Sequence, residues 1–414
     1  MSAPTPTPES GGDLDRIARE RMDQWRRQGL VRVPATFASA QTPTASIDGR
    51  QQLLFSSSNY LSLAEEPAVI EAATAALRTW GTSASGSRLT TGTSAEHRAL
   101  ERELAEFFGS PDAVFFATGY NANISTIQAL VGTGALRTEL TIFSDSLNHA
   151  SLIDGIRLSG ANCVVFPHSD MQALETALQQ RTTPGALVIS DAVFSMDGDI
   201  CRYHSLLEIT RRQGAWLYLD DAHGVGCLGE TGRGIVEWSG ESTLRPEIVV
   251  GTASKALGAE GGFVLCSAAV GTMLRNQARS FVFSTASPPA TIASVRAALR
   301  VLGDQPERVS RLHRNIRTLG ELLAGAGIRS QRPETPIVPI RIGDEAQAME
   351  LAAALHREGF FVPAIRYPTV PRGQALLRVT VMAHHTTEQL TALVDTLVRA
   401  MRQQSTAPNA CGGA

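Results

Sequence analysis

The chain has 414 residues, of which 43% are hydrophobic and 19% are charged, and its formal net charge at pH 7 is -3. This length allows a large hydrophobic core and more than one domain. The nearly balanced charge gives no sign of a nucleic-acid partner or of an anionic membrane surface as a partner. No run approaches 18 consecutive apolar residues, so we expect no transmembrane helix.

The N-terminal residues and the cysteines indicate the cellular compartment. Residues 1–12 are rich in Pro, Thr and Ser and contain no apolar stretch, so we do not expect a signal peptide. The cysteines show neither a Cys-x-x-Cys pair nor the spacing of zinc ligands, and they are Cys163, Cys201, Cys227, Cys266 and Cys411. This odd, scattered set predicts a reduced, cytoplasmic protein without a metal site.

The N-terminal part of the chain contains two predicted helices with a short strand between them. Residues 13–30 have a helical pattern with many charges. Its apolar face consists of Leu14, Ile17, Met22 and Trp25. A β-like segment ends at residues 52–55, and residues 67–80 form the second predicted helix, with proline at its first position and glycine after its end.

Strands and helices alternate from about residue 113 to residue 262. The predicted strands are residues 113–117, 140–143, 163–166, 186–190, 216–219, 248–250 and 262–265. Helical patterns lie between most of them, for example at residues 171–180 and 205–213. This alternation predicts an α/β domain with a mainly parallel central sheet and helices on both faces. Ligands of such sheets bind at the carboxyl ends of the strands.

The composition becomes helical after two prolines at residues 288–289, and a second, smaller α/β unit follows. Its predicted elements are strands at residues 337–342, 361–363 and 376–381 and a last helix at residues 387–401. We therefore predict four parts, namely an N-terminal segment with disordered first residues (1–58), a large domain (59–290), a small C-terminal domain (291–404) and a frayed tail (405–414).

Lys255 is the most informative residue of the chain. It follows the predicted strand 248–250 in a turn rich in glycine and hydroxyl groups, and Asp220 and His223 follow the strand at 216–219. A pyridoxal phosphate enzyme needs a lysine that attaches the cofactor aldehyde, an acid at the pyridinium nitrogen and a group at the ring hydroxyl. A lone lysine is more often a solvated surface residue, but the two motifs together favour cofactor chemistry.

The neighbouring positions refine this interpretation. Asp221 is the less suitable partner for the pyridine nitrogen, because strand alternation points it to the opposite side from Asp220. With Asp220 ionised beside that nitrogen, the ring becomes an electron sink for a carbanion at Cα of a bound amino acid. Once released from the cofactor, Lys255 is placed to act as a general base.

A candidate phosphate site lies at the turn from the strand 113–117 into the next helix. Gly119 and Tyr120 stand at the start of that helix, whose N–H groups and dipole suit a dianion. The turn could also be a simple helix start, but its position before the other two motifs favours a phosphate. Thr252 and Ser254, beside the lysine, could donate hydroxyl hydrogen bonds to it.

Three further residues each have two interpretations. His149 follows a strand and could stack on the pyridine ring, or it could cap a helix or lie in the core. Ser195 could bind the ring hydroxyl, or it could belong to an ordinary turn. Arg378 lies within an apolar strand and needs a carboxylate, which would come either from an internal Asp or Glu or from a substrate.

From about residue 50 to residue 400, the ordered motifs resemble the α-oxoamine synthase family of fold-type I pyridoxal phosphate enzymes. The matching segments are residues 87–92, 119–123, 148–151, 194–199, 220–224, 252–258, 283–289 and 364–371. The last segment is most similar to the 8-amino-7-oxononanoate synthase branch, which acts in biotin synthesis. The resemblance implies a homodimer with the active site at the subunit interface.

The resemblance also implies roles for individual residues. The implied catalytic residues are Lys255, His149, Asp220 and His223. The residues implied to bind pyridoxal 5'-phosphate are Gly119, Tyr120, His149, Ser195, Asp220, His223, Thr252, Lys255 and, from the partner subunit, Thr285. The residues implied to bind substrate are Ser58, Ser87, Arg366 and Arg378.

The implied reaction is a decarboxylative Claisen condensation. Lys255 removes the Cα proton of the amino acid, and the resulting carbanion attacks an acyl thioester. The thiol and carbon dioxide leave, and the product is an α-amino ketone. The branch implies L-alanine and a pimeloyl thioester, carried by coenzyme A or by a carrier protein. Positioning of the thioester contributes much of the rate.

The chain departs from the family pattern near the segments expected to contact substrate. Ser58 stands where the family has an asparagine near the substrate carboxylate, Asn59 where it has an aspartate, and Ser62 where it has a glycine. Tyr367 replaces a common proline, and residues 202–205 lack the proline usual after the Asp-Gly-Asp motif. These changes leave the amino acid and the acyl donor open.

Alternatives therefore remain within and outside the reaction class. A relative could use glycine or serine, as a serine palmitoyltransferase does, or could take its acyl group from a carrier protein in secondary metabolism. An aminotransferase shares the cofactor chemistry but fits the ordered segments less well. A catalytically silent partner subunit is disfavoured because Lys255, Asp220, His223 and His149 are all present.

Overall fold

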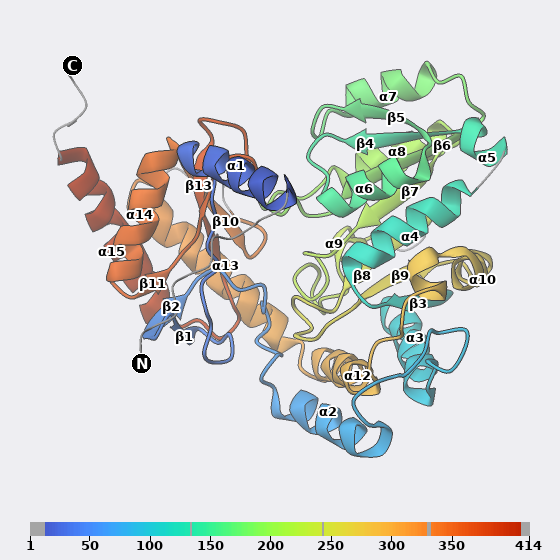
Figure 1. Ribbon diagram of the computed structural model, residues 1–414, viewed down its shortest axis with the longest axis horizontal. Coiled ribbons are helices and arrows are strands. Elements are labelled where there is room, and N and C mark those ends of the chain that lie inside the picture. Colours follow the sequence, from blue (N-terminus) through green and yellow to red (C-terminus); the bar gives the residue numbers. More distant parts are fainter. Residues whose placement is uncertain (1–12, 133–134, 242–243, 329–332, 407–414) are drawn as a thin grey trace.

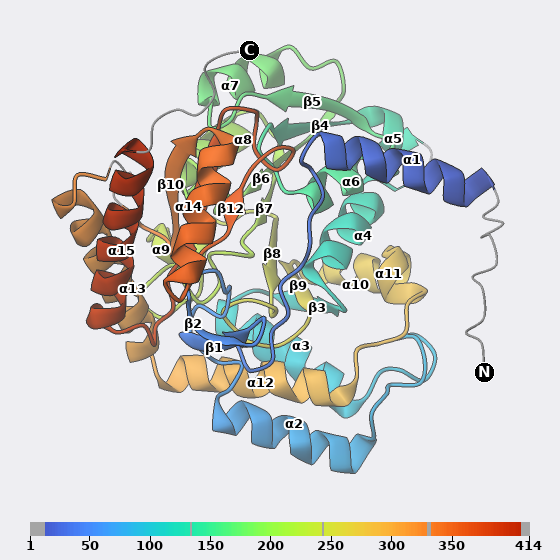
Figure 2. The same ribbon diagram turned by 60° about the vertical axis from the view of Figure 1, so that its left-hand side comes forward.

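The computed structural model describes residues 13–132, 135–241, 244–328 and 333–406 (Figure 1). A large sheet with its helices forms one side of the molecule, and a smaller group of strands and helices forms the other (Figures 1 and 2). The predictions of disordered first residues and of a frayed tail concern residues 1–12 and 407–414, which lie outside the described residues. The predicted division into domains at residues 58 and 290 stays a prediction.

The large sheet has the strand order β3-β9-β8-β7-β6-β4-β5, in which β9 alone runs antiparallel to its neighbours. Its strands are β3 (Asp112–Phe116), β4 (Leu140–Asp145), β5 (Asn162–Phe166), β6 (Gly185–Asp191), β7 (Trp216–Asp220), β8 (Ile248–Thr252) and β9 (Gly262–Cys266). All of the predicted strands of this sheet are present, and each begins and ends within two residues of the predicted position. The predicted mainly parallel sheet is confirmed.

Helices cover both faces of this sheet, as predicted (Figure 2). They include α4 (Gly119–Val131), α6 (Ala150–Ser159), α7 (Met171–Gln179) and α8 (Tyr203–Arg212). Alternate strand residues point to opposite faces. Ile142 and Tyr218 pack with residues of α4 and α6, whereas Phe143 and Leu219 pack with residues of α7 and α8. The long apolar runs of these strands therefore fill two cores at once.

The smaller sheet is antiparallel, with the order β10-β13-β12. Its strands are β10 (Ile337–Gly343), β12 (Ala364–Ile365) and β13 (Ala375–Thr380). Its helices are α13 (Glu307–Gly325), α14 (Glu345–Arg357) and α15 (Thr387–Thr406). The last helix runs five residues beyond its predicted end at Met401 and so includes the first two residues of the predicted tail.

The predicted strand at residues 361–363 is wrong. The chain instead forms β11 (Phe360–Phe361) and β12, which belong to different sheets, and Val362 and Pro363 cross from one to the other. Proline has no N–H to donate to a strand ladder, so a strand does not continue through this position.

The N-terminal strands join the C-terminal part of the chain. β1 (Thr44–Ile47) and β2 (Arg50–Leu54) form a hairpin, and β2 pairs in parallel with β11 through Leu53 and Phe360. The contact continues where Thr380 N donates to Phe55 O over 2.8 Å. Residues at the two ends of the sequence therefore build one small three-stranded sheet.

Three helices pack together at the base of the molecule (Figure 1). They are α2 (Pro67–Trp80), α3 (Ala95–Phe108) and α12 (Pro289–Asp304). Small side chains, Ala76 on α2 against Ala290 and Ala293 on α12, let the two helices approach closely. The remaining helices are α5 (Ala135–Glu139), α9 (Ile235–Trp238), α10 (Ala268–Gln277) and α11 (Arg279–Val282).

The first described helix, α1 (Asp13–Arg27), ends three residues before its predicted end and buries none of its residues. Its apolar face is open to solvent, with Leu14 77% exposed and Trp25 45% exposed. Among the described helices, none combines the length and the hydropathy that a bilayer crossing requires.

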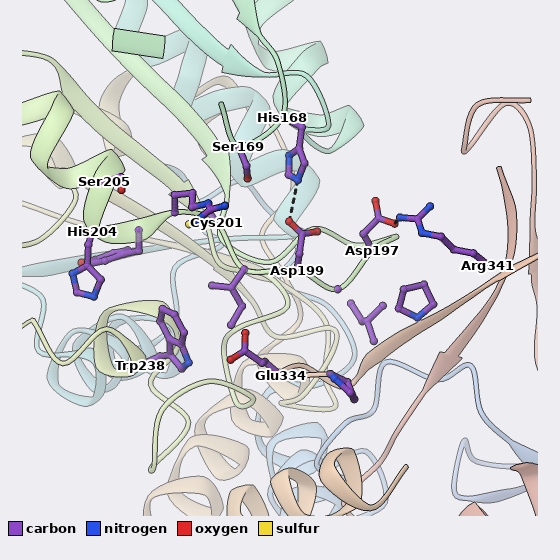
Figure 3. Close-up of a pocket in the computed structure, with 17 residues that line it drawn as sticks. His168, Ser169, Asp197, Asp199, Cys201, His204, Ser205, Trp238, Glu334 and Arg341 are labelled. Carbon is purple, nitrogen blue, oxygen red and sulfur yellow. Dashed lines mark hydrogen bonds and ion pairs between the residues drawn. The ribbon is translucent and has the colours of Figure 1, made fainter. Parts of the chain in front are cut away.

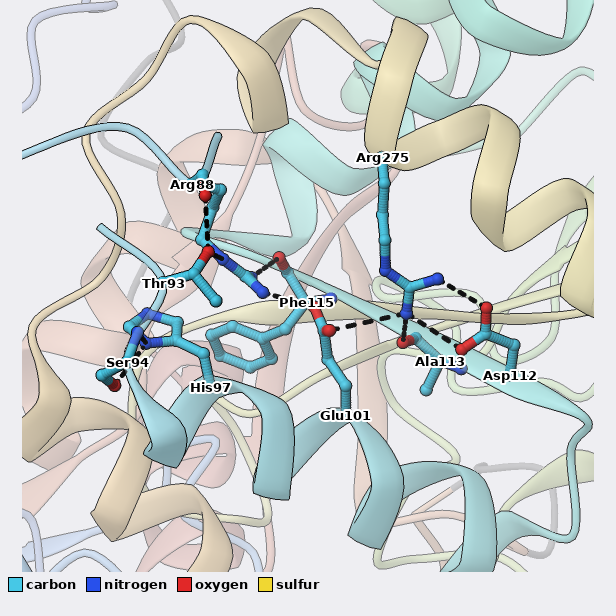
Figure 4. A network of polar contacts seen from close by, with 9 residues as sticks. All are labelled: Arg88, Thr93, Ser94, His97, Glu101, Asp112, Ala113, Phe115 and Arg275. Carbon is cyan, nitrogen blue, oxygen red and sulfur yellow. Dashed lines mark hydrogen bonds and ion pairs between the residues drawn. The ribbon is translucent and has the colours of Figure 1, made fainter. Parts of the chain in front are cut away.

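A buried charge network fixes the loop before α3 (Figure 4). Arg88 donates to Glu101 over 2.9 Å, and the two side chains are only 5% and 4% exposed. Glu101 also accepts from Arg275 at 3.4 Å and from the backbone of Phe115 at 3.2 Å. Arg275 in turn binds Asp112 at 2.6 Å. The loop that carries Ser87 is thereby fastened to α3, β3 and α10.

Candidate active site

A cavity of about 240 Å³ lies at the carboxyl ends of the central strands, where the sequence predicts a ligand. Residues that line it and were expected to bind the cofactor are Gly119, Tyr120, His149, Ser195, Asp220, His223, Thr252 and Lys255. They come from turns that follow different strands of one sheet, so the parallel topology brings them together.

Lys255 lies in the turn after β8, closed by a 2.9 Å hydrogen bond from Gly258 N to its carbonyl. Burial lowers the pKa of the Lys255 amine to about 8, although Asp220 and Asp191 oppose that shift. It is also the only lysine among the 414 residues, a signal in the composition that the motif analysis did not use. Arginine, which does not lose its proton in proteins, supplies the other basic side chains, and lysine is kept where a titratable amine is useful.

Asp220, the last residue of β7, is buried and held by two donors. Asn123 Nδ2 donates to Asp220 Oδ2 over 2.6 Å, and Ala222 N donates to Asp220 Oδ1 over 3.0 Å. Tyr218 donates to Asn123 Oδ1 over 2.7 Å and so fixes the orientation of the amide. Neither Asn123 nor Tyr218 was predicted as a site residue, although Asn123 ends one of the matching segments.

Asp221 takes no part in lining this cavity. Its carboxylate turns to the other side of the strand, where Oδ2 accepts from Ile235 N over 2.7 Å. The direction expected from strand alternation is therefore the one found.

His149 both caps a helix and lines the cavity, so its two interpretations are compatible. Its Nδ1 accepts from Ser151 N at the start of α6 and lies 2.7 Å from Ser151 Oγ. The backbone N–H of His149 donates to Asp191 Oδ2 over 2.9 Å. Burial lowers the pKa of His149, and burial followed by the charge of Asp220 raises the pKa of Asp191 well above its usual value. Ser151 and Asp191 line the same cavity and were not predicted.

His223 is held by a residue that sequence reasoning also missed. Tyr60 OH lies 2.8 Å from His223 Nδ1, and both side chains are buried. Burial, reinforced by the charge of Lys255, lowers the pKa of His223 well below its usual value, which makes the ring neutral. Burial likewise raises the pKa of Tyr60, against the charge of Arg378. No local pattern marks Tyr60, which lies far from His223 in sequence.

Arg378 lies on β13 and reaches the turn that carries Ser195. Its Nε donates to the Ser195 carbonyl over 2.6 Å. Arg378 is buried, with 9% of the residue exposed. It nevertheless forms no ion pair with an Asp or Glu among the residues that the structure describes. The internal Asp or Glu considered as its partner is therefore not found there.

Arg378 is not one of the residues that line this cavity, and the remaining predicted residues also lie outside its lining. Thr285 forms an isolated β-bridge with Ser87, which lies next to the fastened Arg88. Ser58 accepts a backbone hydrogen bond from Tyr60 through its carbonyl over 2.8 Å. Arg366 donates to Val31 O over 3.4 Å. Within one subunit the structure does not bring these residues to the cluster around Lys255.

The N-terminus of α4, where the sequence predicts a phosphate site, forms one end of the cavity. Thr118 caps it by accepting from Asn121 N over 3.0 Å, and the first-turn N–H groups of a helix have no intrahelical partner. A Cβ on Gly262 would lie 2.5 Å from Gly119 N, so glycine is required for β9 to approach this helix end. Amine, carboxylate and helix N-terminus together fit the aldehyde, pyridine nitrogen and phosphate of pyridoxal phosphate.

Residues 50–397 match the family described as aminotransferase class I and II. The 8-amino-7-oxononanoate synthase of Lysinibacillus sphaericus is 42% identical over 92% of this chain and 96% of that enzyme. The chain belongs to the class I and II aminotransferase family, in its α-oxoamine synthase branch. This confirms the family resemblance and the fold class inferred from the motifs.

Two further relatives are similar to this chain. The biotin biosynthesis bifunctional protein BioWF of Corynebacterium kroppenstedtii is 47% identical over 95% of this chain, which spans only 59% of that protein's length. A solved structure of serine palmitoyltransferase with pyridoxal phosphate superimposes with a TM-score of 0.88 at 30% identity, covering 95% of this chain and 100% of that one.

Proposed function

We propose that the chain is a pyridoxal phosphate-dependent α-oxoamine synthase that condenses L-alanine with a pimeloyl thioester. The products are 8-amino-7-oxononanoate, carbon dioxide and the free thiol of coenzyme A or a carrier protein. The observation that carries the proposal is the cavity in which Lys255, Asp220, His223 and His149 meet. The 42% identity to a full-length 8-amino-7-oxononanoate synthase supports the choice of reaction.

When bound, pyridoxal phosphate supplies an electron sink for negative charge at Cα of the amino acid. Asp220, oriented by Asn123, would pair with the ring nitrogen, and the N-terminus of α4 with Thr252 would hold the phosphate. The neutral His223 and Ser195 would bind the ring hydroxyl, and His149 would contact the ring. Thr285 of a second subunit completes the phosphate site.

The proton chemistry belongs to Lys255. With a pKa of about 8, a useful share of the amine is neutral near neutral pH, so Nζ can accept the Cα proton of the amino acid. Arg378 binds the carboxylate of the amino acid, and Ser58, Ser87 and Arg366 are the further substrate-binding residues that the family resemblance implies. A carboxylate fixed by a guanidinium leaves Cα in a defined position relative to Nζ, which lowers the entropic part of the barrier.

We also propose a cytoplasmic homodimer in which each active site uses residues of both subunits. Ser87 and Thr285 pair with each other outside the cavity of their own subunit. Large apolar side chains near Ser87 and Thr285 are exposed to solvent, with Leu89 54% and Phe283 72% exposed. Contact with a second copy of the chain would bury them.

The test is the reaction of the purified holoprotein with L-alanine and pimeloyl-coenzyme A. We expect release of carbon dioxide and of the coenzyme A thiol in equal amounts, with glycine and L-serine as poorer substrates. Formation of a keto acid from L-alanine and 2-oxoglutarate, without thiol release, would instead identify an aminotransferase. Sedimentation of the same sample measures whether it is a dimer.

A serine palmitoyltransferase-like activity is the second candidate. The TM-score of 0.88 with such an enzyme supports it, and Ser58, at a position where the family has asparagine, leaves the amino acid open. Faster thiol release from palmitoyl-coenzyme A with L-serine than from pimeloyl-coenzyme A with L-alanine would select it.

A further inference from the structure

A second cavity, of about 970 Å³, lies beside the turn formed by residues 194–199, which we name the Ser195 loop (Figure 3). His168 and Asp199 face each other on its wall, and Arg341 approaches Asp197 from the opposite side (Figure 3). None of these residues belongs to the site around Lys255. Their contacts nevertheless connect two of the turns that build it.

Both ring nitrogens of His168 face carboxylates. Nδ1 lies 3.0 Å from Asp145 Oδ1, and Nε2 lies 3.0 Å from Asp199 Oδ2. Carboxylates only accept, so both nitrogens must donate, which only the protonated imidazolium can do. The hydrogen bonds to Asp145 and then to Asp199 raise the pKa of His168 to about 10. At neutral pH His168 is therefore a cationic bridge between the carboxylates of Asp145 and Asp199.

On one side the bridge reaches the turn that presents His149. Asp145 ends β4, is almost completely buried, and also accepts from Leu147 N over 2.9 Å. Its carbonyl accepts from Asn148 N over 3.2 Å. The position of Asp145 therefore sets the path of the chain to His149, which comes next.

On the other side the bridge reaches the Ser195 loop. Phe194 N donates to Asp199 O over 3.0 Å, which closes the loop into a compact turn. The Ser195 carbonyl accepts from Arg378, and Arg341 on β10 binds Asp197 over 2.6 Å. A shift of Asp199 is therefore transmitted to Ser195 and, through its carbonyl, to the guanidinium of Arg378.

We propose that His168 is a positioning residue, whose imidazolium holds the His149 turn and the Ser195 loop at a fixed separation across the cofactor site. This rests on the proposed function, because it assigns the bridge to the binding of pyridoxal phosphate and of the amino-acid carboxylate. His168 touches neither group and acts through Asp145 and Asp199.

The experiment compares His168→Gln and Asp199→Asn with a matched control, His204→Gln. His204 lines the same cavity, and its ring packs edge-on against Tyr203 at 5.6 Å. Two quantities are measured for each variant. They are the Kd of the cofactor-free protein for pyridoxal phosphate, by absorbance titration, and the KM and kcat for L-alanine.

We expect each test variant to raise the cofactor Kd and the L-alanine KM by about tenfold, the effect of losing a hydrogen bond to a charged group. We expect kcat to change less than threefold, and His204→Gln to change nothing. The double variant should be no worse than His168→Gln alone, because that change already removes the contact with Asp199.

A lower melting temperature with unchanged Kd and KM would overturn the proposal and leave His168 a purely stabilising residue. If His168→Gln does not fold, Asp199→Asn tests the same contact from its carboxylate partner, without the loss of the contact with Asp145. A wild-type protein that binds pyridoxal phosphate but does not turn over L-alanine contradicts the proposed substrate, while the Kd comparison still decides the role of His168.

Discussion

Asn123 donates a 2.6 Å hydrogen bond to Asp220 while its own amide oxygen accepts from Tyr218 over 2.7 Å. The three side chains are buried and come from α4 and β7, so the carboxylate has a fixed direction before any ligand binds. Such preorganisation is what an ion pair with a pyridinium nitrogen requires.

Asn123→Leu should therefore weaken cofactor binding and destabilise the fold. It removes a donor from Asp220 and leaves the Tyr218 hydroxyl without its acceptor, and an unsatisfied buried group costs about 1–3 kcal/mol. We expect a rise in the Kd for pyridoxal phosphate and a lower melting temperature of the cofactor-free protein. Gln128→Leu on the same helix, which is only half-buried, is the control and should leave the Kd unchanged.

Lys255→Ala should abolish turnover and remove the visible absorbance of the covalently bound cofactor. Because Lys255 is the only lysine, reduction of the holoprotein with borohydride should leave the pyridoxyl group on one peptide, identified by mass spectrometry. The rate at which cofactor-free protein takes up pyridoxal phosphate should rise with pH and level off above about 8, where the amine is neutral. Normal turnover of the variant would refute the mechanism.

Arg378→Ala should raise the KM for L-alanine far more than the Kd for the cofactor. Removal of one partner from a desolvated charge pair costs about 2–5 kcal/mol, so the expected rise is at least about thirtyfold. Initial rates at varied L-alanine and an absorbance titration with pyridoxal phosphate measure the two quantities. Equal losses of both would mean that Arg378 is a structural residue that only fixes the Ser195 loop.

Glu101→Gln should cost about 3–5 kcal/mol of unfolding free energy, because it leaves Arg88 buried without its carboxylate. The matched control on the same helix is Glu106→Gln. Its partner Arg102 lies 3.9 Å away at the surface, so the change should be below about 1 kcal/mol. Denaturant unfolding of the two variants and the wild type gives both values, and equal effects would contradict the role assigned to the buried network.

The bridge of His168 makes a prediction for stability against pH. The pKa of the folded-state imidazolium is about 10, raised above the unfolded value of about 6.5 by Asp145 and Asp199. The contribution of protonated His168 to the free energy of unfolding is therefore complete below about pH 6.5 and is lost as pH rises through about 10. The difference in melting temperature between wild type and His168→Gln should shrink over that range, and a constant difference would mean that no proton is involved.

The sequence predicts those features that depend on neighbouring residues. Apolar runs locate the large-sheet strands, and the residue after a strand must lie at its carboxyl edge, which brings Lys255, Asp220 and His149 together. By contrast, Tyr60 reaches His223 only because the N-terminal strands pair with the C-terminal part of the chain.

The same limit applies to His168. One carboxylate partner ends β4 and the other follows β6, and only the strand order β6-β4-β5 places them beside His168, which follows β5. The break at Pro363 was missed for a different reason, because the apolar residues around it continue across the change of sheet.

The pairing of Leu53 with Phe360 also constrains how the chain folds during its synthesis on the ribosome. These partners are 307 positions apart (360 minus 53), so β2 leaves the exit tunnel long before its neighbour has been synthesised. During that time the edge of the hairpin is open, while the large sheet, built from segments close in sequence, can already close. Stalled or truncated chains that lack β11 should therefore expose a strand edge and depend on chaperones to avoid association.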